Sequence, residues 1–316
     1  HKEYRRQRQM CIRDSLMSAW LKYGIWILFN LCATHAALAQ PLPPKFVLGT
    51  AIAGFQVEMG CPTLAPELCE DRSSDWYEFI TSPWTKLDPS LFMKGQPTSK
   101  GPGFFETYRQ DLGLARNELG SNALRLSLEW SRIFPTATFG VDGFDDLRRI
   151  ASPAALSYYH DLLQEARRLG LEPFVTLNHY TLPRWLHDGV SCHFKLLACE
   201  RRGWADPGTM IPEITKYAAF VAQEFGAEVD HWMTLNEPFS AVVLPSYLLP
   251  TPERSNPPGL YFQVEAAKTA NAAMIEAHAR MYDAIHTADT LAASGEGPAA
   301  QVGICLLYTS DAADDT

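Results

Sequence analysis

The sequence predicts an α/β fold of successive βα units around a parallel sheet. Short apolar runs alternate with amphipathic helical patterns, and glycines end the first three long helices. Polar side chains suited to ligand binding also follow the carboxyl end of each proposed strand. Four or five βα units fit either half of a barrel or a doubly wound sheet, and periodicity alone does not decide. No glycine-rich turn follows any of the strands, which argues against a nucleotide-binding Rossmann domain.

Five apolar runs have the length and composition of buried strands. In chain order they are residues 46–51, 123–128, 173–178, 231–236 and 301–304. Amphipathic stripes predict four long helices between them. These are residues 104–119 before Gly120, 156–169 before Gly170, 214–225 before Gly226, and about 264–285, which follows a proline-rich loop at 250–258.

Composition and charge limit the class of partner. The 316 residues are 47% hydrophobic, which is enough for one large core or two modest ones. The excess of 36 acidic over 27 basic residues gives a formal net charge of −9, which disfavours nucleic acid and anionic membrane surfaces as partners. Aromatic residues make up 11%; they could stack on sugar rings or simply fill a large core.

Residues 17–39 have the pattern of a secretory signal peptide. The apolar run 24–33 is followed by small residues ending Ala37-Leu38-Ala39, which predicts cleavage after Ala39 and a secreted or periplasmic protein. The alternative is a membrane anchor, but the run is shorter than the roughly 20 residues that a bilayer requires. No later segment is long and apolar enough to span a membrane, so we expect no membrane association after cleavage.

Both ends of the chain look foreign. Residues 1–16 are strongly basic and precede a complete signal peptide, and residues 306–316 are small and polar after an abrupt break in pattern. Both contain strings that resemble translated sequencing adapters. We therefore expect the native part to cover residues 40–305 and the gene product to continue beyond it.

Four cysteines fall into two close pairs. Cys61 with Cys69, and Cys192 with Cys199, could each close a short loop as a disulfide in an oxidising compartment; the alternative is unpaired thiols. No His or Cys cluster has the usual zinc spacing, so no metal is expected.

The strand ends share one chemical feature. Each carries amide, imidazole, guanidinium or carboxylate groups, and a polyhydroxylated ligand needs both donors and acceptors. Taken singly, His179 could be a buried structural histidine, Arg125 an ion-pair partner and Gln56 a loop residue. Repetition at four strand ends favours a binding site. The residues are Gln56 and Glu58, Arg125 and Glu129, Asn178 and His179, and Asn236 and Glu237.

With these motifs in order, the sequence is similar to glycoside hydrolase family 1, the β-glucosidase family, over about residues 46–304. The matching segments are FVLGTA at 46–51 leading to QVE at 56–58, SDWY at 74–77, NALRLSLEWSRIFP at 122–135, TLNHYTLP at 176–183, TLNEP at 234–238 and AHA at 277–279. Two positions depart from the common pattern: Tyr180 stands where many members have Trp or Phe, and Leu48 where many have Trp.

The resemblance implies a (β/α)8 TIM barrel, truncated after about the fourth to fifth βα unit, and a retaining β-glycosidase that hydrolyses O-glycosidic bonds without a cofactor. It implies that Glu237 is the general acid/base and that Asn236 contacts the sugar 2-hydroxyl. Gln56 and His179 would hold hydroxyls of the non-reducing-end sugar. Arg125 would sit beside the nucleophile and keep it ionised.

The family's nucleophilic glutamate, in a Thr-Glu-Asn-Gly segment, does not occur in this chain, so we expect the chain alone to be inactive. The expected partner is a small β-glycoside or oligosaccharide, of a sugar that the sequence leaves open. Three alternatives remain at this point. They are a non-catalytic sugar-binding relative, a transglycosidase, and another barrel glycosidase whose fourth strand also ends in Asn-Glu, which the Arg125 and His179 motifs argue against.

Overall fold

The computed structural model describes residues 43, 45–91, 97–251, 255–295 and 297–306. The foreign-looking segment 1–16, the predicted signal peptide 17–39 with its cleavage point after Ala39, and the tail beyond Leu306 lie outside the described residues. The description below concerns the chain from Val47 onward.

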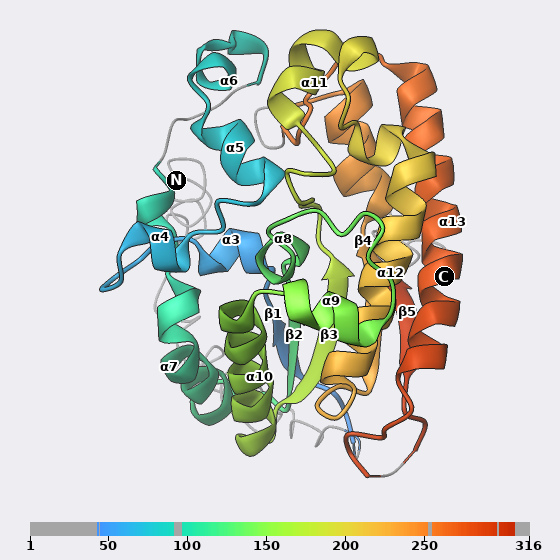
Figure 1. Ribbon diagram of the computed structural model, residues 1–316. Helices are drawn as coiled ribbons and strands as arrows, with labels where there is room; N and C mark the ends of the chain where they lie inside the picture. Colours follow the sequence, from blue (N-terminus) through green and yellow to red (C-terminus); the bar gives the residue numbers. More distant parts are fainter. Residues whose placement is uncertain (1–42, 44, 92–96, 252–254, 296, 307–316) are drawn as a thin grey trace, which may run out of the picture. The chain divides into compact units, whose positions relative to one another are not determined.

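This part of the chain forms one five-stranded parallel sheet flanked by helices (Figure 1). The strand order is β1-β2-β3-β4-β5, and every neighbouring pair is parallel. A doubly wound sheet reverses its strand order at a switch point, whereas a barrel adds each strand next to the previous one. The order observed is that of a barrel. The strands are β1 (Gly49–Ala51), β2 (Ala123–Ser127), β3 (Glu172–Asn178), β4 (His231–Asn236) and β5 (Gln301–Cys305).

The first strand is shorter than the apolar run that predicts it. Ladder pairing with β2 begins only at Gly49, opposite Ala123. Ahead of it, the side chain of Asn122 accepts a hydrogen bond from the Leu48 backbone nitrogen (2.8 Å), and Val47 and Leu48 are exposed. The Leu48 carbonyl accepts from the Asn122 backbone nitrogen (2.8 Å), so Asn122 bonds Leu48 through its backbone and its side chain, just ahead of the ladder.

The helices follow the predicted alternation, with short helices added in the loops. The long ones are α7 (Phe104–Asn117), α10 (Pro153–Arg168), α12 (Pro207–Phe225) and α13 (Val264–Ala288). The short ones are α3 (Gly54–Glu58), α4 (Pro66–Cys69), α5 (Asp75–Thr81), α6 (Pro83–Leu87), α8 (Trp130–Ile133), α9 (Phe144–Ile150) and α11 (Gly189–Lys195). The 3₁₀ turns are η1 (Pro89–Leu91), η2 (Thr98–Lys100), η3 (Leu196–Ala198) and η4 (Gly203–Ala205), and η5 (Pro238–Leu248) is a π-helix.

Local sequence explains where the long helices begin and end. At α10, the Ser152 hydroxyl accepts a hydrogen bond from the Ala155 backbone nitrogen (3.3 Å), and Pro153 occupies the first helical position. Gly170, with φ of +74°, turns the chain out of α10 in the left-handed conformation that glycine adopts without strain.

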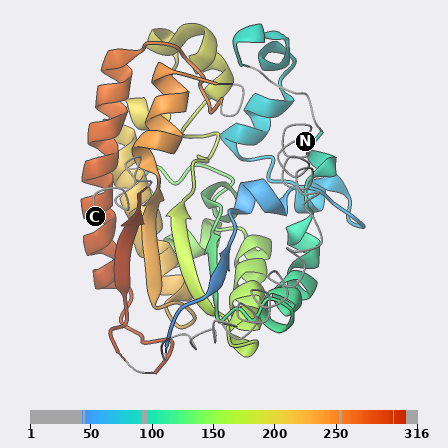
Figure 2. The ribbon, with the colours of Figure 1, turned by 180° about the vertical axis from the view of Figure 1, so that it is seen from behind.

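The core lies between the sheet and these helices. Leu124 and Leu126 of β2 and Val175 and Leu177 of β3 are all at most 2% exposed and belong to one apolar cluster with buried side chains of α7, α10 and α12. α10 and α12 lie in front of the sheet in Figure 1 and behind it in Figure 2. The opposite sheet face carries polar groups, among them Arg125.

Candidate active site

Arg125 connects three strands on the polar face of the sheet. Projecting from β2, its Nε donates to Thr176 Oγ1 of β3 (3.2 Å) and its Nη2 donates to Asn236 Oδ1 at the end of β4. A guanidinium has only donors, so the Asn236 side chain must turn its oxygen toward Arg125. Two of the predicted site residues are therefore in direct contact.

Tyr180 fixes the other end of the Asn236 amide. Asn236 Nδ2 donates to the Tyr180 hydroxyl (2.6 Å), which completes a chain from Arg125 through Asn236 to Tyr180. Tyr180 has φ of +81°, and its ring stacks on Trp76 at a centroid distance of 6.2 Å. His179 meets Tyr180 edge to face at 4.5 Å.

Glu237 stands directly after β4, where the chain leaves the sheet. Its backbone is left-handed, with φ of 43° and ψ of 57°, and its backbone nitrogen donates to the Cys305 carbonyl of β5 (2.8 Å). For a residue with a Cβ this conformation costs about 1–2 kcal/mol. Strain of this kind occurs at functional sites, where it directs a side chain.

Gln56 lies apart from this hydrogen-bonded chain. It is exposed on α3, and it takes no part in the hydrogen bonds that join Arg125, Asn236 and Tyr180. Its neighbour Phe55 packs edge to face on Trp76 at 5.8 Å, so the α3 segment and the Tyr180 segment share Trp76 between them.

Beneath these segments lies a buried group that we call the carboxylate cluster: Glu58, Asp71 and Glu129 with Arg132. Arg132 Nε donates to Glu58 Oε2 (2.6 Å), and Ser131 Oγ donates to Asp71 Oδ2 (2.5 Å). Burial raises the pKa of Glu58 and Asp71, although Arg132 acts in the opposite direction. Burial, reinforced by the charge of Glu58, raises the pKa of Glu129 to about 8.

The sequence predicts Glu58 and Glu129 as members of the strand-end binding site, whereas the structure buries both in the carboxylate cluster, at 2% and 1% exposed. The sequence does not predict Thr176 as a partner of Arg125. Thr176 was detectable in principle, because its strand position places it on the same sheet face as Asn178. In the sequence, Tyr180 stands out only as a departure from the family pattern, which says nothing of a role for its hydroxyl.

The paired cysteines lie close together. Cys61 is joined to Cys69, with Cα atoms 6.0 Å apart, and Cys192 to Cys199, with Cα atoms 5.0 Å apart. In the described part of the chain no group of three or more His, Cys, Asp or Glu side chains is arranged to hold a metal ion. None of the helices described is both long and apolar enough to cross a bilayer.

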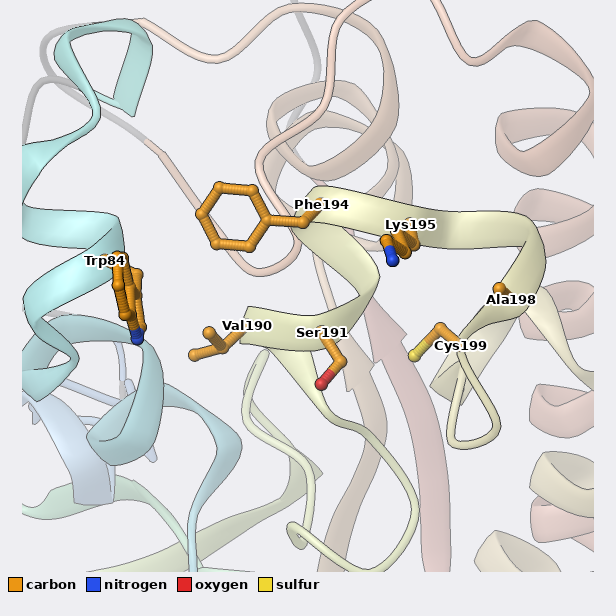
Figure 3. A pocket seen from close by; sticks show the side chains of 7 residues that line it. All are labelled: Trp84, Val190, Ser191, Phe194, Lys195, Ala198 and Cys199. Carbon is orange, nitrogen blue, oxygen red and sulfur yellow. The ribbon is translucent and has the colours of Figure 1, made fainter.

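An open cleft of about 400 Å³ lies between α6 and α11 (Figure 3). None of the predicted sugar-binding residues lines it. Its walls are Trp84, Val190, Ser191, Phe194, Lys195, Ala198 and Cys199.

Comparison with known sequences finds β-galactosidases and β-glucosidases among the relatives. The chain is 37% identical over 283 residues to a β-galactosidase of Pyrococcus woesei, covering 83% of this chain and 53% of that protein. It is 32% identical over 210 residues to β-glucosidase 22 of Arabidopsis thaliana, covering 66% of this chain and 34% of that protein. The chain thus spans about half the length, or less, of these curated relatives.

Solved structures share the fold. The hyperthermophilic β-glucosidase of Pyrococcus furiosus superposes with a TM-score of 0.73 at 30% identity, over 84% of this chain and 56% of that chain. The β-glycosidase of Thermosphaera aggregans gives a TM-score of 0.73 at 29% identity, over 83% and 54%. The five parallel strands thus correspond to part of a TIM barrel, as the sequence predicted.

The profile of Glycosyl hydrolase family 1 matches residues 38–314, which is most of the chain. The chain belongs to glycosyl hydrolase family 1.

Proposed function

We propose that the complete protein containing this chain is a retaining β-glycosidase in which Glu237 is the general acid/base. The observation that carries the proposal is the fixed amide of Asn236, held by Arg125 on one side and Tyr180 on the other, immediately before Glu237. Proton transfer to a bound sugar requires a preorganised hydrogen-bonding group that holds the sugar beside the carboxyl. The end of this barrel strand provides both groups.

The chemistry needs two carboxyl groups, roughly 5–5.5 Å apart. One attacks the anomeric carbon while the bond to the leaving oxygen breaks, and Glu237 gives that oxygen a proton. Glu237 then takes a proton from water, and the resulting hydroxide releases the sugar from the attacking carboxylate. We expect the attacking carboxylate to come from the part of the complete protein that corresponds to the region of the relatives outside this chain. No metal or organic cofactor enters either step.

Arg125 would supply positive charge at the site, which favours the ionised form of the attacking carboxylate. Gln56 and His179 would bind hydroxyls of the sugar, in keeping with their places after β1 and β3. The names of the relatives suggest β-glucosides and β-galactosides as substrates. Hydrolysis of nitrophenyl β-glucoside and β-galactoside by the complete protein tests this choice, and product analysis separates hydrolysis from transfer to a second sugar.

The role of Glu237 is tested by Glu237→Gln in the complete protein. General acid/base catalysis contributes about 10²–10⁴-fold, so cleavage of a disaccharide, whose leaving group is poor, should fall by that factor. Dinitrophenolate leaves without needing a proton, so the rate of the first step with a dinitrophenyl glycoside should fall much less. Both rates are measured by stopped-flow and steady-state kinetics.

Glu276→Gln serves as the matched control, because Glu276 is an exposed carboxylate on α13 that pairs with Arg280. It should leave both rates unchanged. Disaccharide hydrolysis at the wild-type rate by Glu237→Gln would refute the assignment.

A further inference from the structure

Glu129 is a buried carboxyl to which the proposed reaction assigns no step. It is 1% exposed and stands at the point where the chain passes from β2 into α8. The nearby guanidinium of Arg132 bonds to Glu58 instead. The contacts of Glu129 lead to two neighbouring strand ends.

One oxygen of Glu129 faces the segment after β1. Ser127 Oγ donates to Glu129 Oε1 (3.0 Å), and the Gly54 backbone nitrogen donates to the same Ser127 Oγ (2.7 Å). A Cβ placed on Gly54 would lie 2.6 Å from Glu129 Oε1. The carboxyl is therefore packed directly against the first residue of α3, the helix that carries Gln56.

The other oxygen faces the turn after β3. Thr181 Oγ1 donates to Glu129 Oε2 (2.6 Å), and Asn178 Nδ2 donates to the Thr181 carbonyl (2.8 Å). The second bond closes the turn that contains His179, and the first joins that turn to Glu129. The two oxygens of one carboxyl thus reach the two segments that carry Gln56 and His179.

We propose that Glu129 is a positioning residue that fixes the Gln56 segment relative to the His179 segment, and so sets the geometry in which the sugar is bound. The inference rests on the proposed function for its consequence in catalysis. The geometric link between the two segments is independent of that function.

The neutral form of the carboxyl suits this role. Several titratable groups act on Glu129 from the surrounding elements: Glu58 on α3, Asp71 between α4 and α5, Tyr159 on α10 and Tyr217 on α12, whereas Arg132 on α8 acts on Glu58 and Asp71. Arg132 offsets the charges of Glu58 and Asp71, so ionising Glu129 as well places excess negative charge out of water. With a pKa of about 8, Glu129 is protonated at neutral pH and ionises only in alkali.

In the neutral form one of the two hydroxyls rotates to accept: the carboxyl donates to one hydroxyl and accepts from the other, and a glutamine amide can do the same. Glu129→Gln should therefore preserve the link, and Glu129→Ala should break it. The matched control is Glu213→Gln. Glu213 is also buried and accepts a threonine hydroxyl, Thr138 Oγ1 (2.5 Å), but it lies on α12.

The experiment compares the three variants with wild type in the complete protein. Hydrogen–deuterium exchange is followed by mass spectrometry in peptides covering residues 52–59 and 178–183. KM and kcat are measured with nitrophenyl β-glucoside and β-galactoside from pH 5 to 10.

Glu129→Ala should speed exchange at least tenfold in both peptides and raise KM at least tenfold, with a smaller change in kcat. Glu129→Gln should stay within about threefold of wild type at pH 6.5, and its alkaline loss of activity should begin at higher pH. Glu213→Gln should leave the exchange rate of both peptides unchanged.

Unchanged exchange in Glu129→Ala, or a Glu129→Gln variant as impaired as Glu129→Ala, overturns the positioning role. If the wild-type protein hydrolyses neither glycoside but the three variants show the predicted exchange, the proposed function is overturned and the positioning role stands. The two failures are therefore distinguishable.

Discussion

At the scale of single residues, the raised pKa of Glu129 has a consequence for stability as well as for activity. The unfolded carboxyl has a pKa near 4.5 and the folded one about 8, so the folded state binds more protons between these values. Stability from this residue is fully present below pH 4.5 and is lost as pH rises toward 8. The loss reaches at most about 1.4 kcal/mol per pH unit.

Glu129→Gln removes that dependence, since an amide does not titrate. Urea unfolding at pH 5, 6, 7 and 8 should show the variant gaining on wild type as pH rises. Parallel curves for the two proteins across this range would contradict the raised pKa.

The site residues divide according to what a sequence can reveal. Asn236, Glu237, Arg125 and His179 could be located because strand ends of a parallel sheet meet at one edge, so position along the chain predicts position in space. The part played by Tyr180 could not. Its hydroxyl reaches Asn236 only because its backbone adopts φ of +81°, and no residue pattern specifies that value.

At the scale of elements, the start of α3 depends on glycine. Substituting Gly54 by Ala places a methyl group 2.6 Å from Glu129 Oε1 and 2.7 Å from its Cγ, both in a buried environment. Overpacking of this kind costs about 1–3 kcal/mol. We expect Gly54→Ala to lower the free energy of unfolding by that amount.

Gly113→Ala is the control within the same protein. Gly113 lies inside α7, and a Cβ there meets nothing within 4 Å. Alanine is favoured over glycine in a helix by about 1 kcal/mol, so this variant should be more stable than wild type. Chemical denaturation measures the change in the free energy of unfolding, which should be a decrease for Gly54→Ala and an increase for Gly113→Ala. Destabilisation of equal size in both would exclude the packing explanation.

Long elements were predictable and short ones were not. The stripes that predict α7, α10, α12 and α13 extend over several turns, so the 3.6-residue period is visible. α5, α6 and α11 have seven residues or fewer. A helix of that length shows at most two turns of pattern, and its stability comes from caps such as Ser74 and Ser82, whose hydroxyls accept from backbone nitrogens two residues on.

At the scale of the whole molecule, alternation of strands and helices predicts a parallel sheet but not its closure. The sequential strand order favours the barrel, since no reversal occurs among β1 to β5. Strand order depends on which strands pair, and pairing is set by packing between segments that lie far apart along the chain.

Export of the protein remains a proposal, supported by the pattern of residues 17–39 and compatible with the Cys61–Cys69 and Cys192–Cys199 pairs. We expect the exported protein to begin at Gln40. N-terminal sequencing of protein recovered outside the cytoplasm checks this position, and an intact segment 17–39 in that protein would refute the prediction.

The sheet described here has two outer strands, β1 and β5, each paired on one side only among the described strands. Unpaired strand edges recruit further strands. Four of the five residues of β5, among them Val302 and Ile304, are half-buried, and the unpaired edge of β5 is the one that faces away from β4. In the complete protein proposed above, these two edges would be the places where the remaining strands of the barrel pair and close the sheet.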